Sequence, residues 1–310
     1  MITPAKIGSV TLSSPTITAP MEGVSCEAFL KTCAYYGAGM VMTQAIESVD
    51  DNFYDARALE SIPVPVAFQI MTSHPETAAR LAREVKDHVD VIDLNFGCPL
   101  KEVLGKKAGG YLLSYPHLME RIISAVKKEV DIPVTIKIRK GFDDKRITFN
   151  EIAQMARRQG VDAITLHART VRQAYTGDAD WESIKELKSA TEIPVIANGD
   201  IRKPGHAKYL LERGYADAVM IGRTARDDPR IFDRINDALQ SRAEQQVSRK
   251  ELMLRFFSYF KQQRSRPLTQ LKDHVSWMLS GAKQAKRLKT RVRQATSTEG
   301  IERIIKGLEE

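Results

Sequence analysis

Short apolar runs recur along the first 240 residues of the chain and alternate with longer amphipathic stretches. Each run is almost continuously apolar, which is typical of strands buried on both faces of a sheet. Amphipathic helices are expected between most of them, for example over residues 76–88, 117–130 and 150–159, whereas residues 44–62 are polar and predict no helix. The runs cover residues 15–19, 40–43, 66–70, 91–95, 134–138, 163–167, 195–198 and 218–221.

This order of strands and helices predicts the fold. Repeated βα units imply parallel strands joined by helical crossovers. Eight units in about 240 residues match an α/β fold of the (β/α)8 TIM-barrel type. A doubly wound open sheet is the alternative, but the strand count and the lack of a Gly-x-Gly-x-x-Gly motif favour the barrel.

The pattern changes after about residue 240. Four stretches with helical periodicity follow, over residues 251–263, 268–280, 282–293 and 298–308, and no strand separates them. We therefore expect two domains, a barrel over residues 1–240 and a small helical domain over residues 241–310. The boundary is expected in the polar stretch 239–247.

The charge is unevenly divided between these two parts. The chain has 47 Lys and Arg against 39 Asp and Glu, a net charge of +8. Residues 241–310 alone hold 16 basic and 7 acidic residues, so the whole basic excess lies there. Such asymmetry is typical of a segment that binds a polyanion, although a solvated helical surface would have the same composition.

The cysteines and the apolar runs limit the class of protein. Cys26, Cys33 and Cys98 have no regular spacing, which argues against a disulfide framework and favours the reducing cytoplasm. The chain begins without a signal-peptide pattern, and no run approaches the roughly 18 apolar residues of a membrane span. The histidines show no metal-ligand spacing. We expect no membrane, no metal and a monomer.

Cys98 follows the fourth strand, in the sequence Asn-Phe-Gly-Cys-Pro at residues 95–99. Pro99 cannot continue a strand ladder, so the thiol lies just past the C-terminal end of the strand. In a barrel of parallel strands this end carries the active site. A Cys98 nucleophile with His167 as its base is one interpretation, but it does not explain the phosphate-binding signals in the later loops.

Those signals follow the seventh and eighth strands, where such barrels often bind phosphate. Residues 198–200 read Asn-Gly-Asp and residues 222–224 read Gly-Arg-Thr. The glycines allow a close approach of the backbone to an anion, and Arg223 adds a charged fork. Tight turns alone would also explain glycines, but two such loops on adjacent strands favour a phosphate site.

Polar side chains mark other strand ends. Lys137 alternates with Ile136 and Ile138, so it should point into the barrel mouth, where it would meet an anion, an electron-rich ring or Asp93. A lone strand-end histidine such as His167 is more often a satisfied core residue than a catalyst. The whole set suits a polar planar ligand with a phosphate tail, such as flavin mononucleotide (FMN), and consists of Gln69, Asn95, Lys137, His167 and Asn198.

Seven segments, taken together and in order, resemble the tRNA-dihydrouridine synthases, flavin enzymes that reduce a uridine in tRNA. The resemblance covers most of residues 10–237 and, more weakly, the helical tail. The family architecture, a barrel followed by a helical domain, agrees with the strand count and the charge division. The segments are residues 19–23, 95–99, 137–142, 167–170, 175–181, 193–201 and 220–223.

The resemblance implies roles for these residues. Reduced FMN would deliver a hydride to C6 of the uracil and Cys98 would protonate C5 from the other face, with NADPH as the expected reductant. This role needs a neutral thiol, which a pKa of about 8.5 supplies at neutral pH. The implied FMN contacts are Pro20, Met21, Glu22, Gln69, Lys137 and His167 at the ring, and Asn198, Gly199, Asp200, Gly222 and Arg223 at the ribityl phosphate.

The same resemblance implies how tRNA binds. Asn95 and Arg169 would touch the uracil, which must leave its stack to enter a barrel mouth. The basic tail would contact phosphates with salt-dependent affinity, and with Trp277 as its main stacking aromatic we expect recognition of backbone and shape. The expected phosphate contacts are Lys272, Lys283, Lys286, Arg287, Lys289, Arg291 and Arg293.

Some positions depart from the family pattern, among them Gln44, where Glu is common, and Gly110-Tyr111, where a Ser-Ala pair is common. None of them removes an expected catalytic or phosphate-binding group. Two other functions remain as alternatives. A flavin barrel acting on a small molecule would not need the basic tail, and an RNA-binding protein without turnover would not need Cys98 and Arg223.

Overall fold

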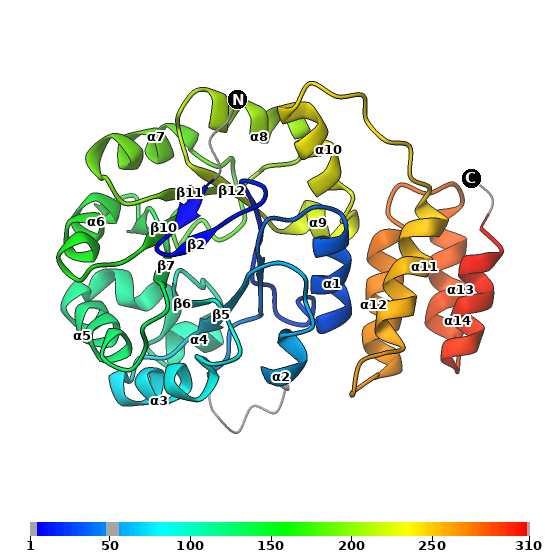
Figure 1. Cartoon of the computed structure of the whole chain (residues 1–310), viewed down its shortest axis with the longest axis horizontal. Helices are drawn as coiled ribbons and strands as arrows, with labels where there is room; N and C mark the ends of the chain where they lie inside the picture. Colours follow the sequence, from blue (N-terminus) through cyan, green and yellow to red (C-terminus); the bar gives the residue numbers. More distant parts are fainter. Residues whose placement is uncertain (1–4, 48–55, 309–310) are drawn as a thin grey trace.

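Eight parallel strands form the centre of the molecule in a computed structural model that describes residues 5–47 and 56–308 (Figure 1). Their order in the sheet is β3-β12-β11-β10-β7-β6-β5-β4. A parallel bridge between Ile17 and Met40 joins the two end strands and closes the barrel. The strands are β3 (Thr16–Thr18), β4 (Val41–Met42), β5 (Val66–Ile70), β6 (Val91–Phe96), β7 (Val134–Arg139), β10 (Ala163–His167), β11 (Val195–Asn198) and β12 (Ala218–Ile221).

The predicted α/β barrel is thus confirmed, and the closure excludes an open doubly wound sheet. The three helices predicted from amphipathicity form, and each ends one to three residues earlier than expected. In the irregular second unit the structure has only the short α2 (Ala56–Leu59), and residues 48–55 lie outside the described part of the chain. The longer outer helices are α1 (Glu27–Tyr35), α3 (Pro75–Val85), α5 (Pro116–Lys127), α6 (Phe149–Arg158), α7 (Trp181–Ala190), α8 (Pro204–Glu212) and α10 (Ile231–Leu239).

Aspartates placed just before a strand tie neighbouring strands together at the N-terminal rim of the barrel. Each carboxylate accepts a hydrogen bond from the first backbone N–H of an adjacent strand, and these bonds fix the strand register, on which the inward or outward direction of every side chain depends. The pairs are Asp90 with Val66, Asp162 with Val134 and Asp217 with Val195, all at 2.8 Å.

The barrel interior is apolar at its base and polar at its mouth. An N-terminal hairpin, β1 (Lys6–Ile7) and β2 (Val10–Thr11), packs under the base, where Ile7 and Leu12 join the inward residues of the strands in one apolar cluster. Further along the strands the inward residues become polar. A second hairpin, β8 (Gly141–Asp143) and β9 (Arg146–Ile147), follows β7. Neither hairpin was predicted, because strands of two or three residues are too short to show a period of two.

Four helices follow the barrel: α11 (Arg249–Phe260), α12 (Leu268–Met278), α13 (Ala285–Gln294) and α14 (Thr298–Lys306). Their positions confirm the four helices predicted from periodicity. Figure 1 shows them as a bundle beside α1 and α9 (Arg223–Asp227). Side chains of α1, α11, α12 and α14 belong to one hydrophobic core cluster that also includes the outward residues of the barrel. Every helix in the described part of the chain is too short or too polar to span a bilayer.

His274 of α12 lies at the centre of this junction. Its side chain is fully buried, stacks on Phe256 with ring centroids 4.7 Å apart, and places Nε2 3.5 Å from Sγ of Cys26. Burial lowers the pKa of His274 to about 3, so the imidazole is neutral at neutral pH. In the unfolded chain a histidine binds a proton near pH 6.5. The stabilising contribution of neutral His274 is therefore complete above pH 6.5 and decreases as the pH falls below that value.

We expect a His274→Phe variant to be less sensitive to acid than the wild-type chain. Between pH 7 and pH 5 the wild type should lose about 2 kcal/mol more free energy of unfolding than the variant, because one proton fewer is bound on unfolding of the variant. Urea denaturation of flavin-free protein at several pH values measures this. As a control, His117→Phe removes an exposed imidazole and should keep the wild-type pH dependence. Parallel curves for wild type and His274→Phe would contradict the expectation.

Candidate active site

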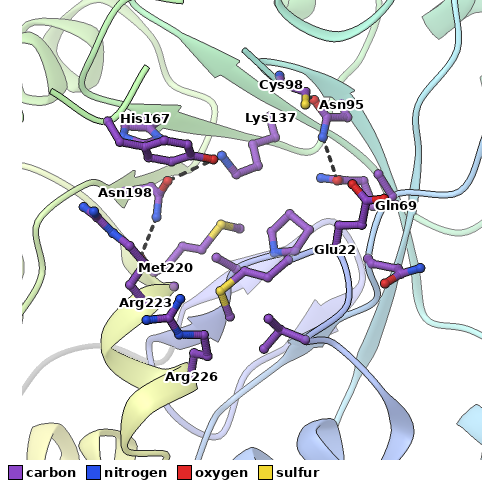
Figure 2. A pocket seen from close by; sticks show the side chains of 18 of the residues that line it. Glu22, Gln69, Asn95, Cys98, Lys137, His167, Asn198, Met220, Arg223 and Arg226 are labelled. Atoms are coloured by element: carbon purple, nitrogen blue, oxygen red, sulfur yellow. Dashed lines mark hydrogen bonds between the residues drawn. The ribbon is translucent and has the colours of Figure 1, made fainter. Parts of the chain in front are cut away.

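The mouth of the barrel opens into a cavity of about 1500 Å³ (Figure 2). Pockets for a single small ligand usually measure about 300–1,000 Å³, so this cavity has room for two ligands. All the site residues predicted within the barrel line it, which brings together side chains from seven strand ends. They are Pro20, Met21, Glu22, Gln69, Asn95, Cys98, Lys137, His167, Arg169, Asn198, Gly199, Asp200, Gly222 and Arg223.

Cys98 lies at this mouth, in a turn that is held on several sides. Oδ1 of Asn95 accepts hydrogen bonds from the backbone N–H of Gly97 (3.1 Å) and of Cys98 (2.9 Å). Nε of the buried Arg139 donates to the carbonyl of Gly97 at 2.9 Å. Gly109 has φ +57° and approaches so closely that a Cβ there would lie 2.9 Å from Cβ of Cys98. The thiol therefore has a defined position facing the cavity.

Burial raises the pKa of the Cys98 thiol above its ordinary value. The nearby charges of Lys137 and Arg139 act in the opposite direction, but burial is the larger effect. Cys98 is therefore a neutral thiol at neutral pH. This is the state that a proton donor needs, and it differs from the thiolate of a nucleophilic cysteine.

Lys137 and His167 face the same cavity in different charge states. Nζ of Lys137 lies 3.4 Å from Oδ1 of Asn198, and burial, with repulsion from Arg139, lowers its pKa to about 8. Lys137 forms no ion pair with Asp93 within 4 Å, so the predicted alternative of an internal salt bridge is not found. Burial, reinforced by the surrounding cations, lowers the pKa of His167 well below 6.5 and keeps it neutral. The lining thus combines an ammonium, a neutral imidazole and amides.

The two predicted phosphate loops lie side by side, since β11 pairs with β12. Gly199 has φ +115°, and a Cβ there would lie 2.9 Å from Cβ of Ala179, so a larger residue does not fit. A Cβ on Gly222 would face Cβ of Ala19 at 3.4 Å across the cavity wall. The Arg223 side chain is 53% exposed at the rim, within reach of an anion. These loops form a cradle, and the guanidinium of Arg223 lies beside it, 3.5 Å from Oδ1 of Asp200.

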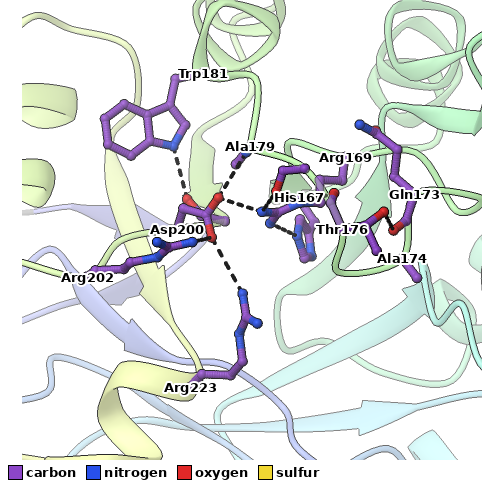
Figure 3. Close-up of polar contacts among 12 residues, drawn as sticks. His167, Arg169, Gln173, Ala174, Thr176, Ala179, Trp181, Asp200, Arg202 and Arg223 are labelled. Carbon is purple, nitrogen blue, oxygen red and sulfur yellow. Dashed lines mark hydrogen bonds and ion pairs between the residues drawn. The ribbon is translucent and has the colours of Figure 1, made fainter.

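Arg169 has a different environment from the one expected (Figure 3). Its side chain is 1% exposed and its guanidinium pairs with Asp200 at 2.5 Å. It also donates to the carbonyls of Thr176 (3.2 Å) and Gly177 (2.6 Å). Asp200 in turn accepts from the backbone N–H of Ala179 at 3.0 Å. Arg169 and Asp200 therefore hold the loop after β10 against the end of β11, and contact of Arg169 with uracil stays a prediction.

Two residues of the mouth carried no assigned role in the sequence. Arg139 continues the inward alternation that identified Lys137, and it donates to the carbonyls of Thr170 (2.9 Å) and Ala174 (2.7 Å) as well as to Gly97. Tyr175 lines the cavity, is 53% exposed and has both Arg139 and Arg223 at 5.5 Å from its ring centroid. The alternation of inward and outward residues along β7 could have identified Arg139 from the sequence. Tyr175 lies in a loop, where no such periodicity exists.

The basic residues predicted in the tail lie away from the cavity lining. Six are on or just before α13, and Lys272 is half-buried on α12. Lys289 donates to Oγ of Ser280 at 2.9 Å. Among the described residues, none of the six forms an ion pair with a carboxylate. The exposed members of this group are Lys283, Lys286, Arg287, Arg291 and Arg293.

Comparison with known proteins decides the family. A family model described as dihydrouridine synthase (Dus) matches residues 17–306. This chain belongs to the dihydrouridine synthase family. A tRNA-dihydrouridine synthase B from Vibrio cholerae is 38% identical over 292 residues, which cover 90% of this chain and 91% of the relative. Another from Vibrio vulnificus is 40% identical over 242 residues, covering 76% and 75%.

Solved structures agree with the fold. A 2-naphthoyl-CoA reductase complex has a TM-score of 0.62 at 14% identity, covering 78% of this chain and 52% of that chain. A morphinone reductase variant with tetrahydroNAD has a TM-score of 0.57 at 12% identity, covering 81% and 93%. At such identities the likeness shows the fold alone. The family membership confirms the resemblance predicted from the sequence, that of a flavin-dependent tRNA-dihydrouridine synthase, an oxidoreductase.

We expect an Asp200→Ala variant to lose about 3 kcal/mol of unfolding free energy, because it leaves the buried Arg169 without its counter-charge. Urea denaturation of flavin-free protein measures the loss. Asp143→Ala is the matched control, since its partner Arg172 is 72% exposed and such pairs contribute less than about 1 kcal/mol. Equal losses in the two variants would show that Arg169 does not depend on Asp200.

Proposed function

We propose that this chain reduces the C5=C6 bond of a uridine in tRNA at the barrel mouth, with FMN as its cofactor, NADPH as its reductant and Cys98 as its proton donor. The observation that carries the proposal is the neutral, positioned thiol of Cys98 facing a cavity with room for two ligands. The family membership supplies the reaction, and the cavity supplies a place for both the cofactor and the base.

The donor set of the cavity suits FMN. Lys137 and His167 offer hydrogen-bonding groups to a polar ring, and Pro20 and Met21 offer an apolar surface beside it. Gly199, Gly222 and Arg223 form the cradle for the ribityl phosphate. When bound in its reduced form, the flavin supplies the hydride that adds to C6 of the uracil.

Cys98 completes the addition by transferring its thiol proton to C5, so the uracil gains one hydride and one proton. The thiolate that remains lies near the charges of Lys137 and Arg139, which stabilise it. The thiolate then takes up a proton from the solvent, which restores the neutral thiol. Burial thus keeps Cys98 protonated before the step, and the two cations limit the cost of deprotonating it.

The tRNA substrate has to be held outside the cavity while one base enters it. We propose that residues 241–310 form a tRNA-binding domain beside the barrel domain of residues 1–240, in a monomeric enzyme. The unpaired cations of α13 would contact tRNA phosphates, and the extruded uridine would reach Asn95 and Cys98.

We expect a Cys98→Ala variant to keep its flavin and its reduction by NADPH but to reduce tRNA uridine at least ~100-fold more slowly, because the proton donor is missing. Dihydrouridine formation on unmodified tRNA, in a single turnover of pre-reduced enzyme, measures this. Cys33→Ala removes a core thiol of α1 and should keep the wild-type rate. Undiminished turnover of Cys98→Ala would refute the acid role, and a purified protein that binds no flavin would refute the cofactor.

The role of α13 is best tested by charge reversal. Deleting residues 241–310 would expose the buried apolar side chains of α1, so it would confuse binding with folding. A Lys286→Glu, Arg287→Glu, Arg291→Glu triple variant should bind tRNA more weakly, with a salt slope smaller by about three, and should keep its flavin.

Binding isotherms at several salt concentrations measure this change. A control variant tests for a general effect of net charge by reversing two exposed arginines of α6, Arg157→Glu and Arg158→Glu. This variant should bind tRNA nearly as tightly as the wild type does. Equal affinity of the triple variant and the wild type at matched salt would refute the proposed contact of α13 with tRNA.

A further inference from the structure

Asp93 is a buried carboxylate that the proposed reaction does not use. It lies in the middle of β6, is fully buried, and does not line the cavity. Its Oδ2 accepts a hydrogen bond from Nε2 of Gln69 at 2.7 Å, and its Oδ1 accepts one from Oγ1 of Thr135 at 2.6 Å. Burial raises its pKa, while these two bonds and the charge of Lys137 act in the opposite direction. A carboxylate in such a position is costly unless hydrogen bonds compensate its burial, as those of Gln69 and Thr135 do here.

A chain of hydrogen bonds runs from Asp93 to the catalytic turn. Oε1 of Gln69 accepts from Nδ2 of Asn95 at 2.8 Å, a bond visible in Figure 2. Oδ1 of Asn95 then accepts from the backbone N–H of Gly97 and of Cys98. The first two links join the neighbouring strands β5 and β6, the last joins Asn95 to residues two and three positions later, and the side chains of Asp93 and Gln69 are fully buried. The chain thus connects Asp93 in the barrel interior, through the cavity-lining Gln69 and Asn95, to the backbone of Cys98.

The direction of this chain is set at Asp93. An ionised carboxylate only accepts hydrogen bonds, so Gln69 must present its amino group to Asp93 and its carbonyl oxygen to Asn95. Asn95 must then present its amino group to Gln69, which leaves its oxygen for the two N–H groups of the turn. If Gln69 were reversed, two amino groups would face each other, and Asn95 would turn an amino group toward the N–H of Cys98. The acceptor-only carboxylate at one end and the two donor-only N–H groups at the other therefore favour the same orientation of both amides.

We infer that Asp93 is a positioning residue, which holds the Cys98 thiol in place by fixing the orientation of Gln69 and Asn95. The inference rests on the proposed role of Cys98 as the proton donor. It places Asp93 in the reaction without contact with substrate or cofactor. Small displacements of a reacting group can lower a rate by ~100-fold, so such a residue affects catalysis strongly from a distance.

Two substitutions separate this role from simple packing. Asp93→Asn can keep its oxygen toward Gln69 while its amino group donates to Oγ1 of Thr135, because a hydroxyl can accept as well as donate. Asp93→Leu keeps the branching of the side chain, with two larger methyl groups in place of the oxygens, but offers no acceptor, so both amides are free to reverse. Asp217→Asn is the control for loss of a strand-tying carboxylate, since Asp217 accepts from the backbone N–H of Val195 at the opposite, N-terminal rim and has no link to Cys98.

The experiment measures three quantities on each folded variant. The first is the rate at which iodoacetamide alkylates Cys98, measured by mass spectrometry of the peptide that contains it. The second is the rate of flavin reduction by NADPH, and the third is the rate of dihydrouridine formation in a single turnover. The buried Cys26 and Cys33 serve as internal references for local unfolding in the alkylation measurement.

For Asp93→Leu we expect Cys98 alkylation to change by ~10-fold and uridine reduction to slow by ~100-fold, with flavin reduction within ~2-fold of the wild type. Asp93→Asn and Asp217→Asn should stay within ~3-fold of the wild type in all three quantities. Unchanged alkylation and turnover in Asp93→Leu would overturn the inference, and so would an equal loss in Asp93→Asn.

A Gln69→Leu variant tests the same chain at its middle link. If Asp93 acts through Gln69, the double variant that carries both Asp93→Leu and Gln69→Leu should show the same Cys98 alkylation rate as Gln69→Leu alone. Additive effects of the two substitutions on this rate would overturn the inference. If Asp93→Leu does not fold, the test is made on folded, flavin-free Gln69→Leu. A Cys98 alkylation rate equal to that of the wild type in this variant would overturn the inference. Alkylation needs no turnover, so it judges the chain even if Cys98→Ala shows that the proposed proton donor is wrong.

Discussion

The alternation of side chains along parallel strands is the constraint on which the rest of this structure depends. All eight strands run in the same direction, so every second residue points inward and the same rim collects all their C-terminal ends. On β5 the inward residues change from apolar to polar between Ala67 and Gln69, and on β6 between Val91 and Asp93. Groups that are far apart in the sequence therefore meet in one cavity, and a shift of register by one residue would remove them from it.

The electrostatics of the mouth follow from burial in this rim. Lys137, Arg139 and Arg169 are gathered around His167 and Cys98, which remain neutral because burial opposes any charge on them. Carboxylates lie where they can orient neighbours: Asp200 neutralises a buried guanidinium, and Asp93 directs two amides. The protonation state that Cys98 needs is thus a property of its position in the barrel.

The sequence predicted the features that have a period or repeat. The eight strands and the four terminal helices followed from apolar runs and helical spacing, and the cavity residues followed from strand ends together with the family resemblance. The short hairpins could not be predicted, because a two-residue strand such as β9 has no measurable period. The partners of buried polar groups could not be predicted either: Arg169 turned toward Asp200, and Asp93 bonded to Gln69 rather than to Lys137, because strand register and loop packing decide such pairs.

The junction between the barrel and the terminal helices links substrate binding to the cavity. Arg226 of α9 lines the cavity, and its guanidinium lies over the ring of Trp277 of α12, 5.3 Å from the centroid. His274 of the same helix lies against Cys26, which follows the cavity-lining segment 19–24. Helix α13 packs on α12, so the cations proposed to bind tRNA are connected to the cavity wall through a continuous set of packed helices.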